Sequence, residues 1–283
     1  MTETALRAHT AVAVDDLITA AAELARSGRS ETALALLDAA STEAPEHRAR
    51  LALAAAEAAL DAGWFKGFDA ATTRLGEAAA VAGDLTADAR WDLDFLRLRH
   101  DYARTVLGDG GFRPGPDGKD PEEMTGLRAR AGELRDLAPD LRRRGWVHHY
   151  LGLISDNVFG EAAAAPADYE AALAAGEESA DDLLTREALR HLGDHAHTRG
   201  DHALALELWR RATFLGARAG NVPGTLSQQM LLAVSARDTG DEAGARALAR
   251  EVARWAEALG ARRLADMANG FLGGQDPTAE PES

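Results

Sequence analysis

The stretch that decides the fold is residues 189–212, LRHLGDHAHTRGDHALALELWRRA. Small and apolar residues recur at helical spacing on both sides of residues 199–201, where Arg-Gly-Asp is suited to a tight turn. These features predict two antiparallel helices joined at the glycine. Gly193 and Ala205 are small enough to let the two helices approach closely, and Trp209 would fill the space one turn further on.

The order of helix, glycine-containing turn and helix recurs along the chain. Ala165, Tyr169 and Ala172 repeat the spacing of the second helix above. Candidate turn glycines lie at positions 28, 63, 160, 200 and 240. In the first unit, Pro45 is expected to end the second helix. The second unit would turn at Gly63 and carry a small insertion at 64–67.

This pattern resembles the tetratricopeptide repeat (TPR), a helical hairpin of about 34 residues. The resemblance is closest over 141–259 and loosest over 83–140. The run WVHHYLGLISDNVFGE, residues 146–161, also resembles TPR proteins common in high-GC actinobacteria. The resemblance implies an all-α, TPR-like right-handed superhelix of about six hairpins with a C-terminal capping helix. It implies no particular reaction.

Three segments are expected from the pattern. Residues 1–13 form an N-terminal segment, 14–272 the solenoid, and 273–283 a disordered acidic tail. Within the solenoid, 83–140 is irregular and 108–121, GDGGFRPGPDGKDP, is a loop without apolar period. It is not a calcium loop, because Arg113 stands where an acid is needed, nor a P-loop, because Asp120 follows Lys119. It is either a tolerated insertion or a lid over a binding site.

Composition narrows the classes of function. The chain of 283 residues has a net charge of −15 and no cysteine. The negative field disfavours nucleic acid as a partner, and the lack of cysteine excludes disulfides and thiolate metal sites. The N-terminus lacks a secretory pattern, and no apolar run approaches the ~18 residues of a membrane span. A cytoplasmic protein without membrane contact or cofactor is expected, and a homodimer is left open.

In TPR proteins the first helix of each pair lines the concave groove. Transferring that register, with the family's Leu-Gly pair set on Leu192 and Gly193, predicts which side chains face the groove. They are Trp146, His149, Asp156, Asn157, Glu187, Arg190, Asp194, His197, Met230 and Arg237.

Histidine, asparagine and arginine on one face favour ligand binding, because their hydrogen bonds are directional. Arg190 and Arg237 could clamp a carboxylate or phosphate. The predicted partner is therefore a peptide, a protein segment or a small acidic metabolite. Alternatively, the predicted groove face has no binding role and is an ordinary polar surface with internal salt bridges.

An enzyme acting on a small molecule is the second functional class. His149 with Asp156, or His197 with Asp194, could form an acid–base pair. No nucleophile or dinucleotide signature accompanies these residues.

A metal site is a further alternative. His191 and His195 are four residues apart and share one helix face. The register turns both toward the preceding hairpin or solvent, so structural histidines are the favoured interpretation and no metal is expected.

Overall fold

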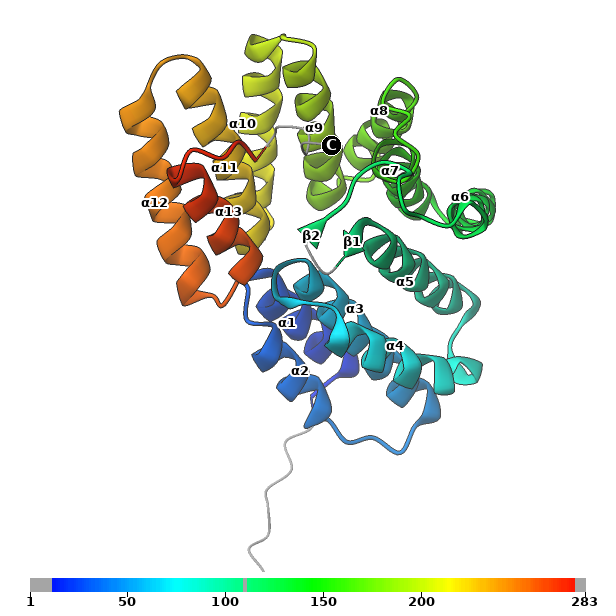
Figure 1. Ribbon diagram of the computed structural model, residues 1–283. Coiled ribbons are helices and arrows are strands. Elements are labelled where there is room, and N and C mark those ends of the chain that lie inside the picture. Colours follow the sequence, from blue (N-terminus) through cyan, green and yellow to red (C-terminus); the bar gives the residue numbers. More distant parts are fainter. Residues whose placement is uncertain (1–11, 109–110, 278–283) are drawn as a thin grey trace, which may run out of the picture.

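The computed structural model describes residues 12–108 and 111–277. Over these residues the chain forms helical hairpins that follow one another around a ring (Figure 1). The paired helices are α1 (Val14–Arg26) and α2 (Ser30–Asp38), α3 (Pro45–Lys66) and α4 (Asp69–Ala80), α5 (Ala87–Val106) and α6 (Pro121–Asp136), α7 (Leu141–Asn157) and α8 (Ala165–Glu178), α9 (Asp182–Thr198) and α10 (His202–Arg218), and α11 (Val222–Asp238) and α12 (Glu242–Ala258).

The last helix, α13 (Arg262–Leu272), packs against α11 and α12. A short 3-10 helix, η1 (Ala82–Asp84), and two strands, β1 (Leu107–Gly108) and β2 (Gly111–Phe112), complete the described elements. This arrangement confirms the predicted all-α, TPR-like fold of six hairpins and a capping helix. Within the described residues, no helix is long and apolar enough to cross a membrane.

The turns of the C-terminal hairpins use one recurring device. Gly200 and Gly240 have φ angles of 80° and 88°, a region that glycine enters without steric cost. The aspartate that follows each glycine then caps the next helix: Asp201 accepts a hydrogen bond from the Leu204 amide at 3.1 Å, and Asp241 from the Gly244 amide at 2.9 Å.

An aromatic side chain fixes the approach of the two helices in a hairpin. A Cβ atom on Gly193 would lie 2.5 Å from Trp209 Cδ1, and one on Gly152 would lie 2.6 Å from Tyr169 Cε1. Trp209 and Tyr169 are fully buried. The ring therefore rests directly on the glycine, not one turn beyond it as the sequence suggested.

The N-terminal hairpins differ from the prediction. Helix α3 continues through Gly63, which lies beneath the Phe68 ring, and the chain turns at Gly67 with a φ of 105°. Pro45 begins α3 instead of ending α2, because a proline at the first helical position loses no hydrogen bond. The interval between Gly28 and Gly67 is thus close to the interval between the later turns.

The two ends of the superhelix meet. Phe65 of α3 packs against the C-terminal core cluster, and α3 contacts α13. A Cβ atom on Gly28, in the α1–α2 turn, would lie 3.1 Å from Leu259 Cδ2 in the α12–α13 turn. Figure 1 shows this junction where the blue N-terminal helices adjoin the orange and red C-terminal ones. The helices therefore enclose a closed ring.

The predicted loop at 108–121 follows α5, and Figure 1 draws its two strands toward the middle of the ring. Strands β1 and β2 pair antiparallel, so the segment is not wholly irregular. The Gly115 amide donates to the Asn157 carbonyl at 3.0 Å, and the Arg113 amide donates to the Val106 carbonyl at 2.7 Å. These bonds hold the segment against the C-terminal ends of α5 and α7. Residues 109–110 lie outside the described residues.

Most of the predicted terminal segments also falls outside the described residues, which exclude 1–11 and 278–283. Between α13 and that limit, Asp276 accepts a hydrogen bond from Arg237 at 2.6 Å. The beginning of the predicted disordered tail is therefore fixed to α11.

Candidate functional site

Helix α9 brings the candidate site together. Asp181 caps its first turn by accepting hydrogen bonds from the Leu183 and Leu184 amides at 3.0 Å. The helix buries Leu184, Ala188 and other small or apolar residues against its neighbours. Its remaining face carries charged and polar side chains. These meet side chains of α7 on the inner side of the hairpins.

His149 of α7 lies at the centre of this group. Its side chain is 4% exposed, and its ring centroid is 5.4 Å from the centroids of both Tyr150 and His191. Burial, together with the charges of Arg190 and other arginines, lowers its pKa to about 3. His149 is therefore neutral at pH 7, and its Nδ1 has no hydrogen-bond partner within the described residues.

His191 of α9 is held in the same state. Its ring stacks on Tyr169 at 4.9 Å, with 12° between the ring planes. Burial and the nearby Arg190 lower the pKa of His191 well below its usual value. The two imidazoles therefore offer neutral ring nitrogens at pH 7.

Two arginines flank these histidines. Arg186 is 4% exposed, donates from Nη2 to the Gly224 carbonyl at 2.9 Å and pairs with Glu187. Burial and the charge of Arg190 lower the pKa of Arg186 to about 9. Its Nε finds no partner in the described part of the chain.

Arg190 is the second of these two arginines. Its Nη1 lies 3.3 Å from His191 Nε2, and its Nε is buried without a partner among the described residues. Over the same residues no carboxylate forms an ion pair with Arg190. Asp194, one turn on, is occupied by the Trp209 indole at 3.0 Å, and burial raises its pKa. The charge of Arg190 acts against this increase, but Asp194 forms no ion pair with the guanidinium within the described residues. A partly buried guanidinium without a directly paired carboxylate favours an anionic ligand.

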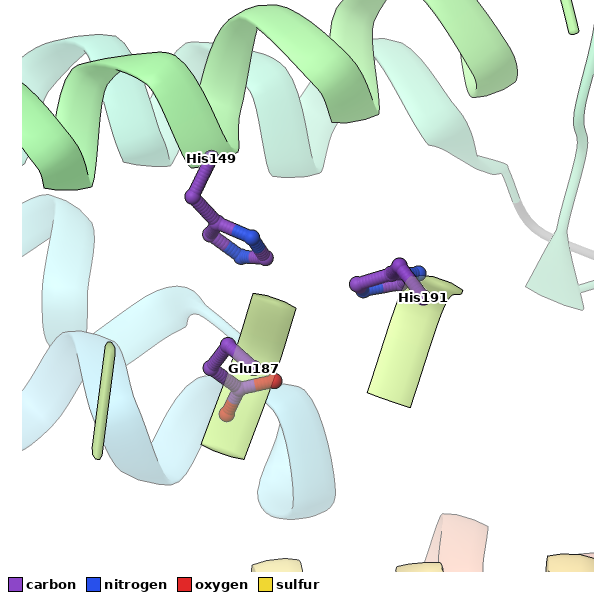
Figure 2. A group of neighbouring side chains, drawn as sticks. All are labelled: His149, Glu187 and His191. Carbon is purple, nitrogen blue, oxygen red and sulfur yellow. The ribbon is translucent and has the colours of Figure 1, made fainter. Parts of the chain in front are cut away.

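The donor atoms of His149, Glu187 and His191 also come within 4.8 Å of one another, and Figure 2 shows the three side chains turned toward a common space. Two imidazoles and a carboxylate are a donor set that suits a transition metal. Arg186 and Arg190, however, contact Glu187 and His191 and place positive charge at the same point. The electrostatics therefore favour an anion here over a divalent cation.

The predicted groove residues divide into two sets. Trp146, His149, Glu187, Arg190 and Asp194 gather around α7 and α9. The Trp146 ring is 5.8 Å from that of His149, and its Nε1 donates to Asp181 at 3.0 Å. Of the other five, Asp156, Asn157 and His197 lie in the last turns of α7 and α9, and Met230 and Arg237 lie on α11.

Neither predicted acid–base pair forms. Asp156 accepts from the Tyr169 hydroxyl and contacts His195 Nε2, both at 2.9 Å, so it does not serve His149. His197 lies 3.7 Å from Asp238, away from Asp194. The register alone could not predict these partners, because His195 reaches back to α7 while His197 reaches forward to α11.

Asn157, Met230 and Arg237 are removed from the site by other contacts. Asn157 donates to the Tyr102 hydroxyl at 2.9 Å. Met230 is fully buried in the C-terminal core, because its face of α11 is covered by α12 and α13. Arg237 is held by the segment after α13, through Asp276, and lies 4.4 Å from the Phe271 ring centroid. Arg237 is thus paired within the chain, and the Arg190–Arg237 clamp around a ligand stays a prediction.

The sequence analysis missed Arg186 and Tyr169. Arg186 is not among the groove positions that the TPR register predicts, although its spacing of four residues from Arg190 puts the two on one helix face. Tyr169 was identified only as a packing residue of the hairpin. Its stacking on His191 depends on side-chain conformations that no spacing reveals.

No protein-family model and no curated protein matches the sequence. Two solved structures align with the chain along most of its length. One is a Signal Transduction ATPase with Numerous Domains with a TPR sensor from Pyrococcus horikoshii, at 16% identity and a TM-score of 0.48 over 93% of this chain. This chain covers 39% of that structure. A Rap protein complexed with Competence and Sporulation Factor aligns at 11% identity and a TM-score of 0.53, over 90% of this chain and 68% of that one.

Proposed function

We propose that this chain is a TPR-like regulatory protein that recognises an acidic group of a peptide or protein segment on the inner face of α7 and α9. The observation that carries the proposal is Arg190, a partly buried guanidinium that lacks a carboxylate partner within the described residues. A ligand carboxylate would supply the counter-charge. Arginine suits this role because its planar fork can bind both carboxylate oxygens.

The neighbouring side chains support the same class of ligand. His149 and His191 are neutral at pH 7, so they can donate or accept hydrogen bonds without adding charge. Trp146 offers an apolar surface beside them. The site thus combines one unsatisfied cation, neutral polar groups and aromatic rings, as ligand sites commonly do.

Binding without catalysis fits this geometry better than an enzyme. The carboxylates that would act as partners of catalytic histidines are engaged by Tyr169, His195 and Trp209. The fold is compatible with recognition, since the similar Rap structure is a complex with Competence and Sporulation Factor. A small acidic metabolite is the alternative ligand. We also propose that the protein acts in the cytoplasm.

The test begins by selecting binders from a peptide library with the immobilised protein. The best acidic peptide is then titrated beside its amide counterpart, in which Asn and Gln replace Asp and Glu. Replacing Arg190 with Ala should weaken binding of the acidic peptide about tenfold or more, because hydrogen bonds to charged groups contribute about 1.5–3 kcal/mol. Arg210→Ala is the matched control, because Arg210 is an exposed arginine of the outer helix α10.

Equal affinity of wild type and Arg190→Ala for the acidic peptide, with helical content unchanged, would remove Arg190 from the site. Native mass spectrometry of the protein purified from its own host separates the two ligand classes. A small co-purifying mass lost in Arg190→Ala would favour the metabolite over the peptide.

A further inference from the structure

A second cluster of ligating side chains lies at the rim, at the turn between α9 and α10. His197 is in the last turn of α9, His202 begins α10, and Asp238 ends α11. The left-handed conformation of Gly200 reverses the chain between the two histidines. Consequently the two imidazoles lie side by side in an edge-on arrangement, with ring centroids 5.0 Å apart and 62° between their planes.

The spacing of the donor atoms is that of a metal site. His197 Nδ1 and His202 Nδ1 are 3.2 Å apart. Two nitrogens bound to one zinc ion at about 2.0–2.1 Å, with a tetrahedral angle between them, are about 3.3 Å apart. The structure thus holds the two nitrogens close to the separation that a shared ion requires.

Asp238 supplies the third donor. One donor atom from each of the three residues lies within 4.8 Å of the others. Asp238 Oδ2 is 3.7 Å from His197 Nε2, the ring nitrogen that does not face His202, so the carboxylate has to turn to reach an ion held by Nδ1. Asp238 is exposed, so its carboxylate has room to turn toward the nitrogens. It also provides negative charge for a cation.

The surroundings of this cluster differ from those of Arg190. Arg237, next to Asp238 in sequence, is bound to Asp276. Arg199, the remaining cation of the turn, is exposed. His197 packs against the Trp209 ring at 5.3 Å, which supports its orientation from behind.

We propose that His197, His202 and Asp238 bind a divalent transition-metal ion of the zinc class. Imidazole and carboxylate donors suit zinc, and three protein ligands leave a fourth position for water. The ion would join the α9–α10 turn to the end of α11 and so link two successive hairpins. This proposal is independent of the function proposed for Arg190.

The experiment is calorimetric titration of ZnCl2 into the full chain after chelator treatment, with Co²⁺ absorption as a report of tetrahedral coordination. Wild type should bind one ion per chain, and Zn²⁺ should raise its melting temperature because the ion binds the folded state. His202→Asn should weaken binding by at least about tenfold, since loss of even an outer partner of a metal ligand commonly costs that much. Asp238→Asn should weaken it as well.

His47→Asn is the matched control, since it removes a histidine at the start of α3 that belongs to neither cluster. Retained affinity in His202→Asn would overturn the proposal, as would the absence of saturable binding below about 1 mM Zn²⁺, the weak end of specific recognition. Loss of binding in His191→Asn but not in His202→Asn would also overturn it and would place the ion beside Arg190.

Discussion

At the scale of single residues, burial and nearby positive charge both disfavour protonation of His149. Protonating this ring would place a charge among aromatic rings and beside Arg190 and Arg186. The unfolded chain imposes neither penalty, so it binds the proton more readily. Acidification therefore lowers the stability of the folded state through this histidine.

We expect stability to fall as the pH drops from about 6.5, the ordinary histidine pKa, toward the folded value of about 3. Each proton taken up only by the unfolded state costs about 1.4 kcal/mol per pH unit. His149→Phe, which keeps an aromatic ring but cannot titrate, should lose less stability between pH 7 and pH 5 than wild type. Urea unfolding at both pH values measures this difference.

Gly126→Ala serves as the control, because it changes no ionisable group. Its stability should depend on pH as that of the wild type does. An identical loss of stability in His149→Phe and wild type would show that His149 does not contribute.

The sequence could predict residues of the site only as far as helical periodicity carries. It brought His149, Glu187 and Arg190 to one face, because spacing along a helix fixes direction. It could not choose between Asp156 and other partners for His149, since that choice depends on side-chain conformation across two helices. It also could not show that Arg190 lacks a counter-ion.

At the scale of the elements, the hairpins depend on a glycine in one helix and a large ring in the other. Trp209 occupies the space where the Gly193 side chain would be, and its indole bridges to the Arg190 carbonyl at 3.2 Å. The same contact thus packs the hairpin and fixes the backbone beneath the proposed binding site.

Gly193→Ala should destabilise the protein by about 1–3 kcal/mol, because the added methyl group overpacks against Trp209. Gly126→Ala is the matched control: no atom lies within 4 Å of a Cβ there, and the change should stabilise α6 by up to about 1 kcal/mol through helix propensity. Denaturant unfolding of both variants gives the comparison. Equal effects of the two substitutions would contradict the packing argument.

The sequence predicted the succession of hairpins but misplaced the turn of the second one and treated 83–140, which contains α5 and α6, as irregular. Gly63 matched the TPR spacing better than Gly67, yet Phe68 packs on Gly63 and the helix continues past it. A similar limit applies to Met230. The periodicity placed it on a polar face, but the capping helix covers that face.

At the scale of the whole molecule, contact between the first and last hairpins was not predictable from the sequence. It depends on small rotations between successive hairpins, which add up around the ring. The summed rotations bring the two ends into contact at Phe65 and between Gly28 and Leu259.

Phe65→Ala should lower the free energy of unfolding by about 2 kcal/mol, since it leaves a gap between α3 and the C-terminal core. Hydrogen exchange should rise in both α1–α2 and α13, the elements on either side of the junction. Phe214→Ala is the matched control, because Phe214 is 62% exposed on α10 and its loss should change stability by no more than about 0.5 kcal/mol. Faster exchange confined to α3 would contradict the coupling of the two ends.

The junction at Gly28 and Leu259 has a further consequence for how such a protein can change over evolution. An open repeat array gains or loses a unit with little effect on the others, because each unit touches only its neighbours. Duplication of one hairpin in this chain would separate the N-terminal and C-terminal hairpins that now meet, and would expose Phe65. Closure of the ring thus fixes the number of hairpins, and a new binding specificity has to arise by changing side chains within the ring.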